Sequence, residues 1–305
     1  MTHPMSHPLR FAANLSWLYT DLPFLDRFAA AARDGFTAVE CLFPHEHPTA
    51  DIAARLRDTG LQMVLFNAAP GDWAAGERGL AGLADRDADF QRSIHDALAR
   101  ADAFDCPRIH VMAGKGPSVH ADPVRHEAAL ATYESRLRWA VAQTEAAGRL
   151  LTIEPLNPRD MPDYLLRTQA QAHEIVGRIG SAALKVQLDL YHLQVTEGDV
   201  SMALRRWLHG DRDGQGGGQV GHIQIAAVPD RCEPDDGELN ADWLWAELRR
   251  LGWTGWIGCE YRPRRAPDPA RPGWATTAGL GWLARAQAPD DGGHALSSAM
   301  SAHRA

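Results

Sequence analysis

The chain has 305 residues, enough for one α/β barrel, and its 45% hydrophobic and 23% charged residues are typical of a globular protein. The net charge of −8 disfavours nucleic acid as the main partner, because phosphate binding needs a basic surface. No stretch approaches the length of a membrane span, and the N-terminus "MTHPMSHPLR" has no signal-peptide core. We therefore expect a cytoplasmic protein without a membrane partner.

Eight short apolar runs predict β-strands, and they recur along the whole chain. In chain order they are "RFAANLSW" from Arg10, "TAVECLF" from Thr37, "LQMVLFN" from Leu61, "RIHVMAG" from Arg108, "LLTIEPL" from Leu150, "LKVQLDLYH" from Leu184, "VGHIQIA" from Val220 and "WIGCEY" from Trp256.

Amphipathic stretches between these runs predict helices. The first, "DLPFLDRFAAAARDG", has Asp21 as the expected N-cap and Gly35 as the stop. Further helices are expected over 87–105, 125–149 and 240–252, and a weaker, glycine-containing one over 273–287.

Eight strands that alternate with helices predict a parallel sheet with helical crossovers, and in a chain of this length they predict a (β/α)8 TIM barrel. A doubly wound sheet is the alternative, but "NLSWLYTDLP" after the first strand lacks the glycine-rich turn typical of that fold. We expect a single barrel domain over residues 1–288, a flexible loop at 209–219 and a disordered polar tail at 289–305. The four cysteines are widely spaced and are expected to be free thiols.

Four consecutive strands carry an oxygen-donor side chain at their carboxyl ends. Side chains alternate faces along a strand, so the apolar sets should face the helices and the polar sets should line the barrel. The donors are Glu154, Asp189, Gln224 and Glu260, separated by 35, 35 and 36 residues. Each separation is one βα unit, so we expect the four to be neighbours around the rim.

Converging carboxylates repel one another unless a cation offsets their charge. Oxygen ligands suit Mg²⁺ or Mn²⁺ better than zinc, so the four residues predict a divalent metal site. The alternative is that each acid only caps a strand or pairs with a nearby arginine.

Other polar residues have two interpretations each. His192, in "DLYH", could face the substrate or be a loop histidine, and Glu40 could bind substrate or hold another side chain. His110 could be a ligand or a hydrogen-bonded core histidine. Arg78, in the long loop "NAAPGDWAAGERGLA", could bind a substrate carboxylate, oriented by Glu77, or lie on a surface excursion.

At these residues the chain resembles the hydroxypyruvate isomerase family, within the xylose-isomerase-like barrels, from about Arg10 to Gln287. The most specific stretch is "GDWAAGERG", and "VECLFP", "HVMAG", "IEPLN", "QLDLYH", "HIQIA" and "GCEY" agree in order. The resemblance implies that Glu154 and Glu260 are the catalytic acid and base, that Asp189 and Gln224 complete the metal ligands, and that His192 belongs to a D-x-x-H motif. The chain departs from the pattern at Asp163 and Tyr164, in the glycine-rich insert and in the tail.

The resemblance also implies the chemistry: isomerisation of hydroxypyruvate to 2-hydroxy-3-oxopropanoate through an enediolate, within glyoxylate and carbohydrate-acid metabolism. The expected partner is a small hydroxy-oxo acid, and homo-oligomerisation stays open. The alternatives are a 2-oxo-tetronate isomerase, a ketose 3-epimerase and a non-catalytic sugar-acid-binding protein. An apurinic endonuclease is disfavoured by the acidic charge and the single histidine near the ligands.

Overall fold

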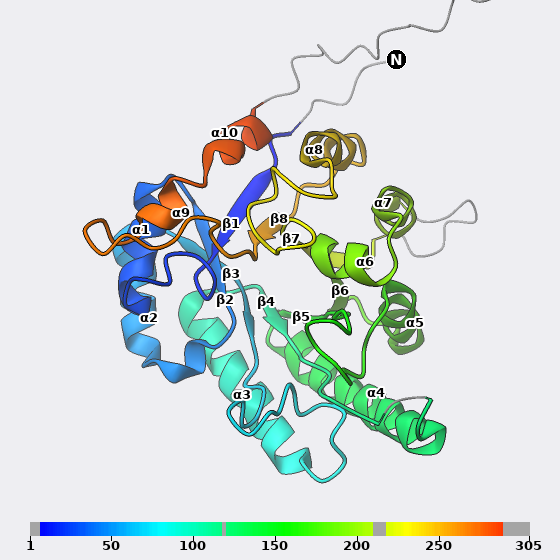
Figure 1. Cartoon of the computed structure of the whole chain (residues 1–305). Coiled ribbons are helices and arrows are strands. Elements are labelled where there is room, and N and C mark those ends of the chain that lie inside the picture. The colour runs from blue at the N-terminus through cyan, green and yellow to red at the C-terminus, as the bar shows by residue number, and fades with distance from the viewer. Residues whose placement is uncertain (1–6, 118–119, 210–217, 289–305) are drawn as a thin grey trace, which may run out of the picture.

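The strands form a closed parallel barrel in the computed structural model, which describes residues 7–117, 120–209 and 218–288. Each strand pairs with its sequence neighbours, and β1 pairs with β8 to close the ring (Figure 1). The strands are β1 (Arg10–Asn14), β2 (Ala38–Cys41), β3 (Gln62–Asn67), β4 (Arg108–His110), β5 (Leu150–Ile153), β6 (Leu184–Asp189), β7 (Val220–Ile225) and β8 (Trp256–Cys259). The predicted fold class and all eight predicted strands are confirmed.

Helices lie outside the ring of strands (Figure 1). They are α1 (Arg27–Arg33), α2 (Thr49–Thr59), α3 (Asp87–Phe104), α4 (Pro123–Ala146), α5 (Gln169–Ile179), α6 (Leu190–Thr196), α7 (Val200–His209), α8 (Ala241–Arg250), α9 (Trp274–Thr277) and α10 (Gly281–Gln287). Two short 3₁₀ helices, η1 (Phe24–Asp26) and η2 (Pro44–Glu46), precede α1 and α2.

Two helix predictions were wrong in detail. Asp21 does not cap the first helix, since a 3₁₀ turn intervenes and α1 begins only at Arg27. The Asp21 carboxylate instead accepts a hydrogen bond from the backbone N–H of Gly273 at 2.8 Å, which ties the β1–α1 loop to α9. The last predicted helix is split into α9 and α10 around Gly279, where an added Cβ would lie 2.2 Å from Oε1 of Glu233.

The barrel interior changes character along its axis. Near the amino ends of the strands it holds a small apolar cluster of Ala12, Ala38, Val64 and Trp256. Towards the carboxyl ends the same faces carry buried polar side chains such as Asn14, Glu40 and Gln187. The apolar residues of the opposite faces join one large core beneath the helices. The fold therefore gathers buried polar groups at one end of the barrel, where active sites of this architecture lie.

The described residues settle part of the remaining expectations. They contain no helix long and apolar enough to cross a membrane. All four cysteines are free; Cys41, Cys106 and Cys259 are buried, and Cys232 is partly exposed. The predicted disorder of residues 289–305 and most of the predicted loop at 209–219 lie outside the described residues.

Candidate active site

The four predicted oxygen donors are all buried at the carboxyl end of the barrel. Glu154 follows β5, Asp189 ends β6, Gln224 lies in β7 and Glu260 follows β8. Their exposed fractions are 4%, 0%, 1% and 6%. Buried carboxyl groups are rare without partners or a function, so their convergence makes this end of the barrel the candidate site.

The four donors do not stand at one level. Asp189 pairs directly with Gln224, as the equal spacing predicts, but Gln224 pairs with Gly258, so Glu260 lies two residues further along its strand. The amide of Gln224 donates to Oε1 of Glu40 at 2.7 Å and accepts from Nε2 of Gln187 at 2.6 Å. Gln224 therefore already belongs to the polar network inside the barrel.

Glu154, Asp189 and His192 offer ligand atoms within 4.8 Å of one another, a spacing that could hold a divalent cation. Oδ1 of Asp189 caps α6 by accepting from the backbone N–H groups of Tyr191 (2.7 Å) and His192 (3.1 Å). Its Oδ2 and Oε1 of Glu154 are buried and have no hydrogen-bond partner among the described residues. Two buried carboxylate oxygens without donors are costly alone and suit a hard cation, so the residues fit Mg²⁺ or Mn²⁺.

His192 is better placed as a hydrogen-bond donor than as a metal ligand. Its Nδ1 accepts from the backbone N–H of Asn157 at 3.0 Å and lies 2.8 Å from that residue's Nδ2. Burial lowers the pKa of His192 well below its usual range, and the charge of Arg231 lowers it further, so the ring is neutral. A neutral ring that accepts at Nδ1 carries its proton on Nε2, which makes Nε2 a donor.

The three carboxyl groups resist ionisation together. Burial raises the pKa of Glu154 well above its usual range, and the charges of Glu260 and Asp189 raise it further. Burial raises the pKa of Glu260 to about 8 although Arg231 counteracts it, and burial also raises that of Asp189. Without a cation the cluster holds protons near neutral pH, whereas a bound cation would favour the ionised forms.

Arg231 is a buried residue of the candidate site that the sequence reasoning missed. Its Nη2 donates to Oε1 of Glu260 at 2.6 Å, and its Nη1 lies 3.4 Å from Oδ2 of Asp160. The guanidinium carbon lies 4.5 Å from the ring centroid of Trp17 and 4.8 Å from that of Tyr191. Arg231 has a φ of 54°, and it lies in the β7–α8 loop, where no periodic pattern marks it. The buried, positively charged side chain of Arg231 thus lies beside the carboxylates.

Glu40 organises the layer beneath the carboxylates. Its carboxylate accepts hydrogen bonds from Asn14 at 2.9 Å, Gln224 at 2.7 Å and Nε2 of His222 at 2.6 Å. Of its two predicted roles, these contacts match the one in which Glu40 holds other side chains. Asn14, at the end of β1, takes part in the same network.

His110 sits beside Glu154 and is neutral. Burial lowers the pKa of His110 to about 3, with a smaller contribution from His222. Its Nδ1 donates to Oδ1 of Asn67 at 3.2 Å and lies 3.7 Å from Oε2 of Glu154. Its Nε2 has no hydrogen-bond partner among the described residues. His110 is therefore a hydrogen-bonded core histidine whose Nε2 can still accept a hydrogen bond.

Arg78 makes its contacts within its own loop. Nη1 donates to the carbonyl oxygens of Trp73 (2.9 Å) and Glu77 (2.7 Å), and the guanidinium stacks on the Trp73 ring at 3.8 Å. The sequence left open whether Glu77 orients Arg78 or points at solvent; its carboxylate instead pairs with Arg86 and accepts from the backbone N–H of Asp72. Binding of a substrate carboxylate by Arg78 stays a prediction.

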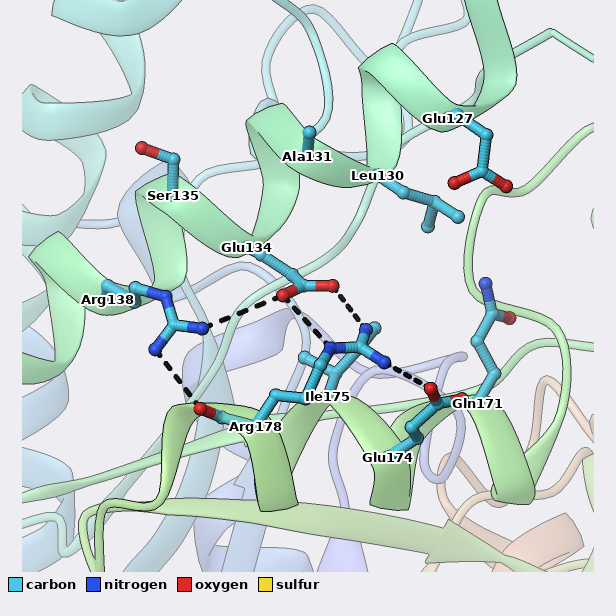
Figure 2. Close-up of a pocket in the computed structure, with 10 residues that line it drawn as sticks. All are labelled: Glu127, Leu130, Ala131, Glu134, Ser135, Arg138, Gln171, Glu174, Ile175 and Arg178. Atoms are coloured by element: carbon cyan, nitrogen blue, oxygen red, sulfur yellow. Dashed lines mark hydrogen bonds and ion pairs between the residues drawn. The ribbon is translucent and has the colours of Figure 1, made fainter. Parts of the chain in front are cut away.

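A groove of about 680 Å³ between α4 and α5, on the outside of the barrel, is a different kind of surface. Figure 2 shows its charged side chains turned toward one another: Glu134 pairs with Arg138 and Arg178, and Arg178 also pairs with Glu174. These charges offset each other at the surface, where such pairs are worth little. The groove therefore does not compete with the barrel end as the candidate site.

Comparisons with known proteins agree with this geometry. The family described as xylose isomerase-like TIM barrel matches residues 28–286. A 2-oxo-tetronate isomerase of Cupriavidus necator is 53% identical over 274 residues, covering 90% of this chain and 97% of that protein. Hydroxypyruvate isomerase of Escherichia coli is 35% identical over 275 residues, covering 90% and 98%.

One solved structure, named AP endonuclease, family 2, from Brucella melitensis, superposes with a TM-score of 0.81 at 40% identity, covering 92% of this chain and 100% of that one. A family match over most of the chain and relatives of this identity together fix the family. The chain therefore belongs to the xylose isomerase-like TIM barrel family, as an enzyme of the hydroxypyruvate isomerase type, which confirms the family and enzyme class predicted from the sequence.

Proposed function

We propose that this protein is an isomerase that moves the carbonyl of a short 2-oxo acid between C2 and C3, and that its preferred substrate is 2-oxo-tetronate. The observation that carries the proposal is the pair of buried glutamates, Glu154 and Glu260, whose raised pKa values suit proton transfer near neutral pH. Moving a carbonyl to the neighbouring carbon needs one proton taken from C3 and one delivered to C2, and two carboxyl groups supply both.

The reaction needs no external oxidant. Loss of the C3 proton gives an enediolate with oxygen on C2 and C3. Transfer of the hydroxyl proton from O3 to O2, together with protonation at C2, then leaves the carbonyl on C3 and a hydroxyl on C2. One glutamate removes the first proton and the other delivers the second. Arg231 holds Glu260 in one orientation through its 2.6 Å hydrogen bond. The Nε2–H of His192 is a donor for a substrate oxygen.

A divalent cation would be held by Glu154 and Asp189, with Gln224 and Glu260 as the further ligands predicted from the sequence. When bound it would offset the charge of the carboxylates and stabilise negative charge on the substrate oxygens. Asp189 keeps its place in this arrangement because one oxygen caps α6 while the other faces the site.

The names of the relatives support 2-oxo-tetronate as the preferred substrate. Three relatives named 2-oxo-tetronate isomerase are 53%, 44% and 36% identical, whereas those named hydroxypyruvate isomerase, some of them putatively, are 34–39% identical. Hydroxypyruvate, the substrate favoured by the sequence resemblance, is the second candidate, since it undergoes the same shift one carbon shorter. The solved epimerase structures are only 15–22% identical and support the fold alone.

The test is a substrate panel. Purified protein with Mg²⁺ or Mn²⁺ is incubated with 2-oxo-tetronate, hydroxypyruvate and a neutral ketose, and products are identified by NMR. We expect the highest kcat/KM for 2-oxo-tetronate and a lower one for hydroxypyruvate. Turnover of the neutral ketose alone, with a product epimerised at C3, would contradict the proposal and favour an epimerase.

A further inference from the structure

Trp17 joins two arginines at the mouth of the barrel. It follows β1, which pairs with β8, so its loop lies beside the residues that follow Glu260. The guanidinium of Arg231 lies 4.5 Å from the Trp17 ring centroid, and that of Arg262 lies 5.2 Å from it. The backbone N–H of Arg262 also donates to the carbonyl oxygen of Arg231 at 2.8 Å, which fixes the end of β8 to the β7–α8 loop.

The two arginines differ in how their charge is used. Arg231 is buried and pairs with Glu260 and Asp160. Arg262 is exposed, and its guanidinium lies over the Trp17 ring. No carboxylate of the described residues lies within ion-pair distance of that guanidinium. Trp17 itself keeps a shielded indole N–H that has no acceptor among the described residues. The Arg262 guanidinium and the Trp17 indole N–H are therefore hydrogen-bond donors without an acceptor oxygen from a side chain of the described residues.

We propose that Arg262, positioned by the ring of Trp17, receives the carboxylate of the substrate and so selects oxo acids over neutral ketoses. This inference rests on the proposed function, and it names the group that defines the substrate class. In a 2-oxo acid the carboxylate is bonded directly to C2, a carbon that exchanges a proton, so its receptor must lie close to the catalytic carboxylates. Arg262 follows Glu260 by two residues, and its planar fork matches a carboxylate.

Arg78 is the competing receptor, since it too lacks an ion pair among the described residues. It already donates to two carbonyl oxygens and stacks on Trp73 within the β3–α3 loop. Arg231 is less suited, because a carboxylate bound there would compete with Glu260 for the same guanidinium. The two free arginines can be separated by substitution, since they lie on different loops.

Binding of 2-oxobutanoate separates the subsite from turnover, because this acid lacks the hydroxyl that isomerisation needs. Calorimetric titration in Mg²⁺ should give a Kd that rises roughly 10- to 100-fold in Arg262→Ala, as expected for loss of a charged hydrogen bond. Arg265→Ala is the matched control: an exposed arginine on the same loop that stacks on Trp274, and its Kd should be unchanged. Failure of 2-oxobutanoate to bind the unmodified protein, or equal Kd values in Arg262→Ala and the control, would overturn the inference.

Kinetics with 2-oxo-tetronate and the neutral four-carbon ketose erythrulose complete the test. Arg262→Ala should raise KM for the acid about tenfold or more, change kcat little, and leave the ketose parameters as they are. Trp17→Leu should raise the same KM, whereas Trp17→Phe, which keeps a ring, should raise it less. An acid-selective rise in Arg78→Ala but not in Arg262→Ala would overturn the inference. If no acid is turned over while 2-oxobutanoate binding still depends on Arg262, the proposed function fails and the subsite stands.

Discussion

Arg231 donates a hydrogen bond from Nη2 to Oε1 of Glu260 over 2.6 Å, so a loop arginine fixes the orientation of a buried carboxylate that follows a different strand. The contact is buried on both sides, and two aromatic rings, Trp17 and Tyr191, flank the guanidinium. Burial raises the pKa of Glu260, and Arg231 is the main group that opposes this rise. The loop between β7 and α8 therefore tunes the proton affinity of the site.

Replacing Arg231 by glutamine should shift the pH dependence of the reaction. Loss of the positive charge makes ionised Glu260 less stable, so its pKa should rise further. In a plot of kcat/KM against pH, the change in activity caused by titration of Glu260 should therefore move to higher pH, whichever protonation state of Glu260 is active. We also expect kcat/KM at the optimum to fall by roughly tenfold or more, because Glu260 loses a charged hydrogen bond. Arg159→Gln is the control: it removes an arginine that donates hydrogen bonds to the Tyr191 hydroxyl and the Pro229 carbonyl oxygen, and it should leave the pH dependence of kcat/KM unchanged.

Asp189→Asn should weaken metal binding while preserving the fold. Asparagine keeps the oxygen that caps α6, so the helix should start as before, but the unpartnered oxygen loses its charge. Titration of Mn²⁺ into chelator-treated protein should give a Kd about tenfold higher or more than that of the parent. Asp268→Asn, which removes a carboxylate that pairs with Arg271 and accepts from the backbone N–H of Ala270, serves as the control. Equal Mn²⁺ affinity in Asp189→Asn and the parent would remove Asp189 from the ligand set.

Gly258→Ala should disturb the layer of hydrogen bonds beneath the carboxylates. A Cβ at Gly258 would lie 2.3 Å from both carboxylate oxygens of Glu40, which cannot move without breaking bonds to Asn14, His222 and Gln224. We expect a loss of about 1–3 kcal/mol in the free energy of unfolding, the usual cost of overpacking. Gly281→Ala, where no atom lies within 4 Å of the added Cβ, should be neutral or slightly stabilising in denaturant unfolding. A Gly258→Ala protein as stable as the parent would show that Glu40 can shift freely.

The barrel was predictable because its signal is repeated. Eight apolar runs separated by helical periods leave few topologies, and alternation along each strand assigns the inward face. Glu154, Asp189 and Glu260 could be found in this way, since each occupies an inward position at a strand end. The predicted cap at Asp21 was wrong, because a carboxylate two residues before Pro23 can bind a distant backbone N–H as readily as one in its own helix.

The remaining parts of the site depend on register and on loops. Equal spacing along the chain placed Gln224 level with Asp189 but did not reveal that Glu260 lies beyond Gln224 by two residues, because strand register varies around a barrel. Arg231 lies in a loop without periodicity, and only the folded position of Glu260 gives it a role. The tautomer of His192 likewise follows from Asn157, through a contact between α6 and the β5–α5 loop that sequence spacing does not encode.

The central claim is that Glu154 and Glu260 carry out the two proton transfers of one isomerisation, and NMR of 2-oxo-tetronate in D₂O tests it most directly. The parent protein should incorporate deuterium as it isomerises the substrate, while Glu154→Gln and Glu260→Gln should remain folded and isomerise at least roughly 10²-fold more slowly. One of the two variants should still exchange a single substrate proton, which would assign the base. Glu247→Gln, a buried glutamate on the outer helix α8, is the control and should keep full activity per folded molecule. Near-parental isomerisation by either Glu154→Gln or Glu260→Gln would contradict the two-glutamate mechanism.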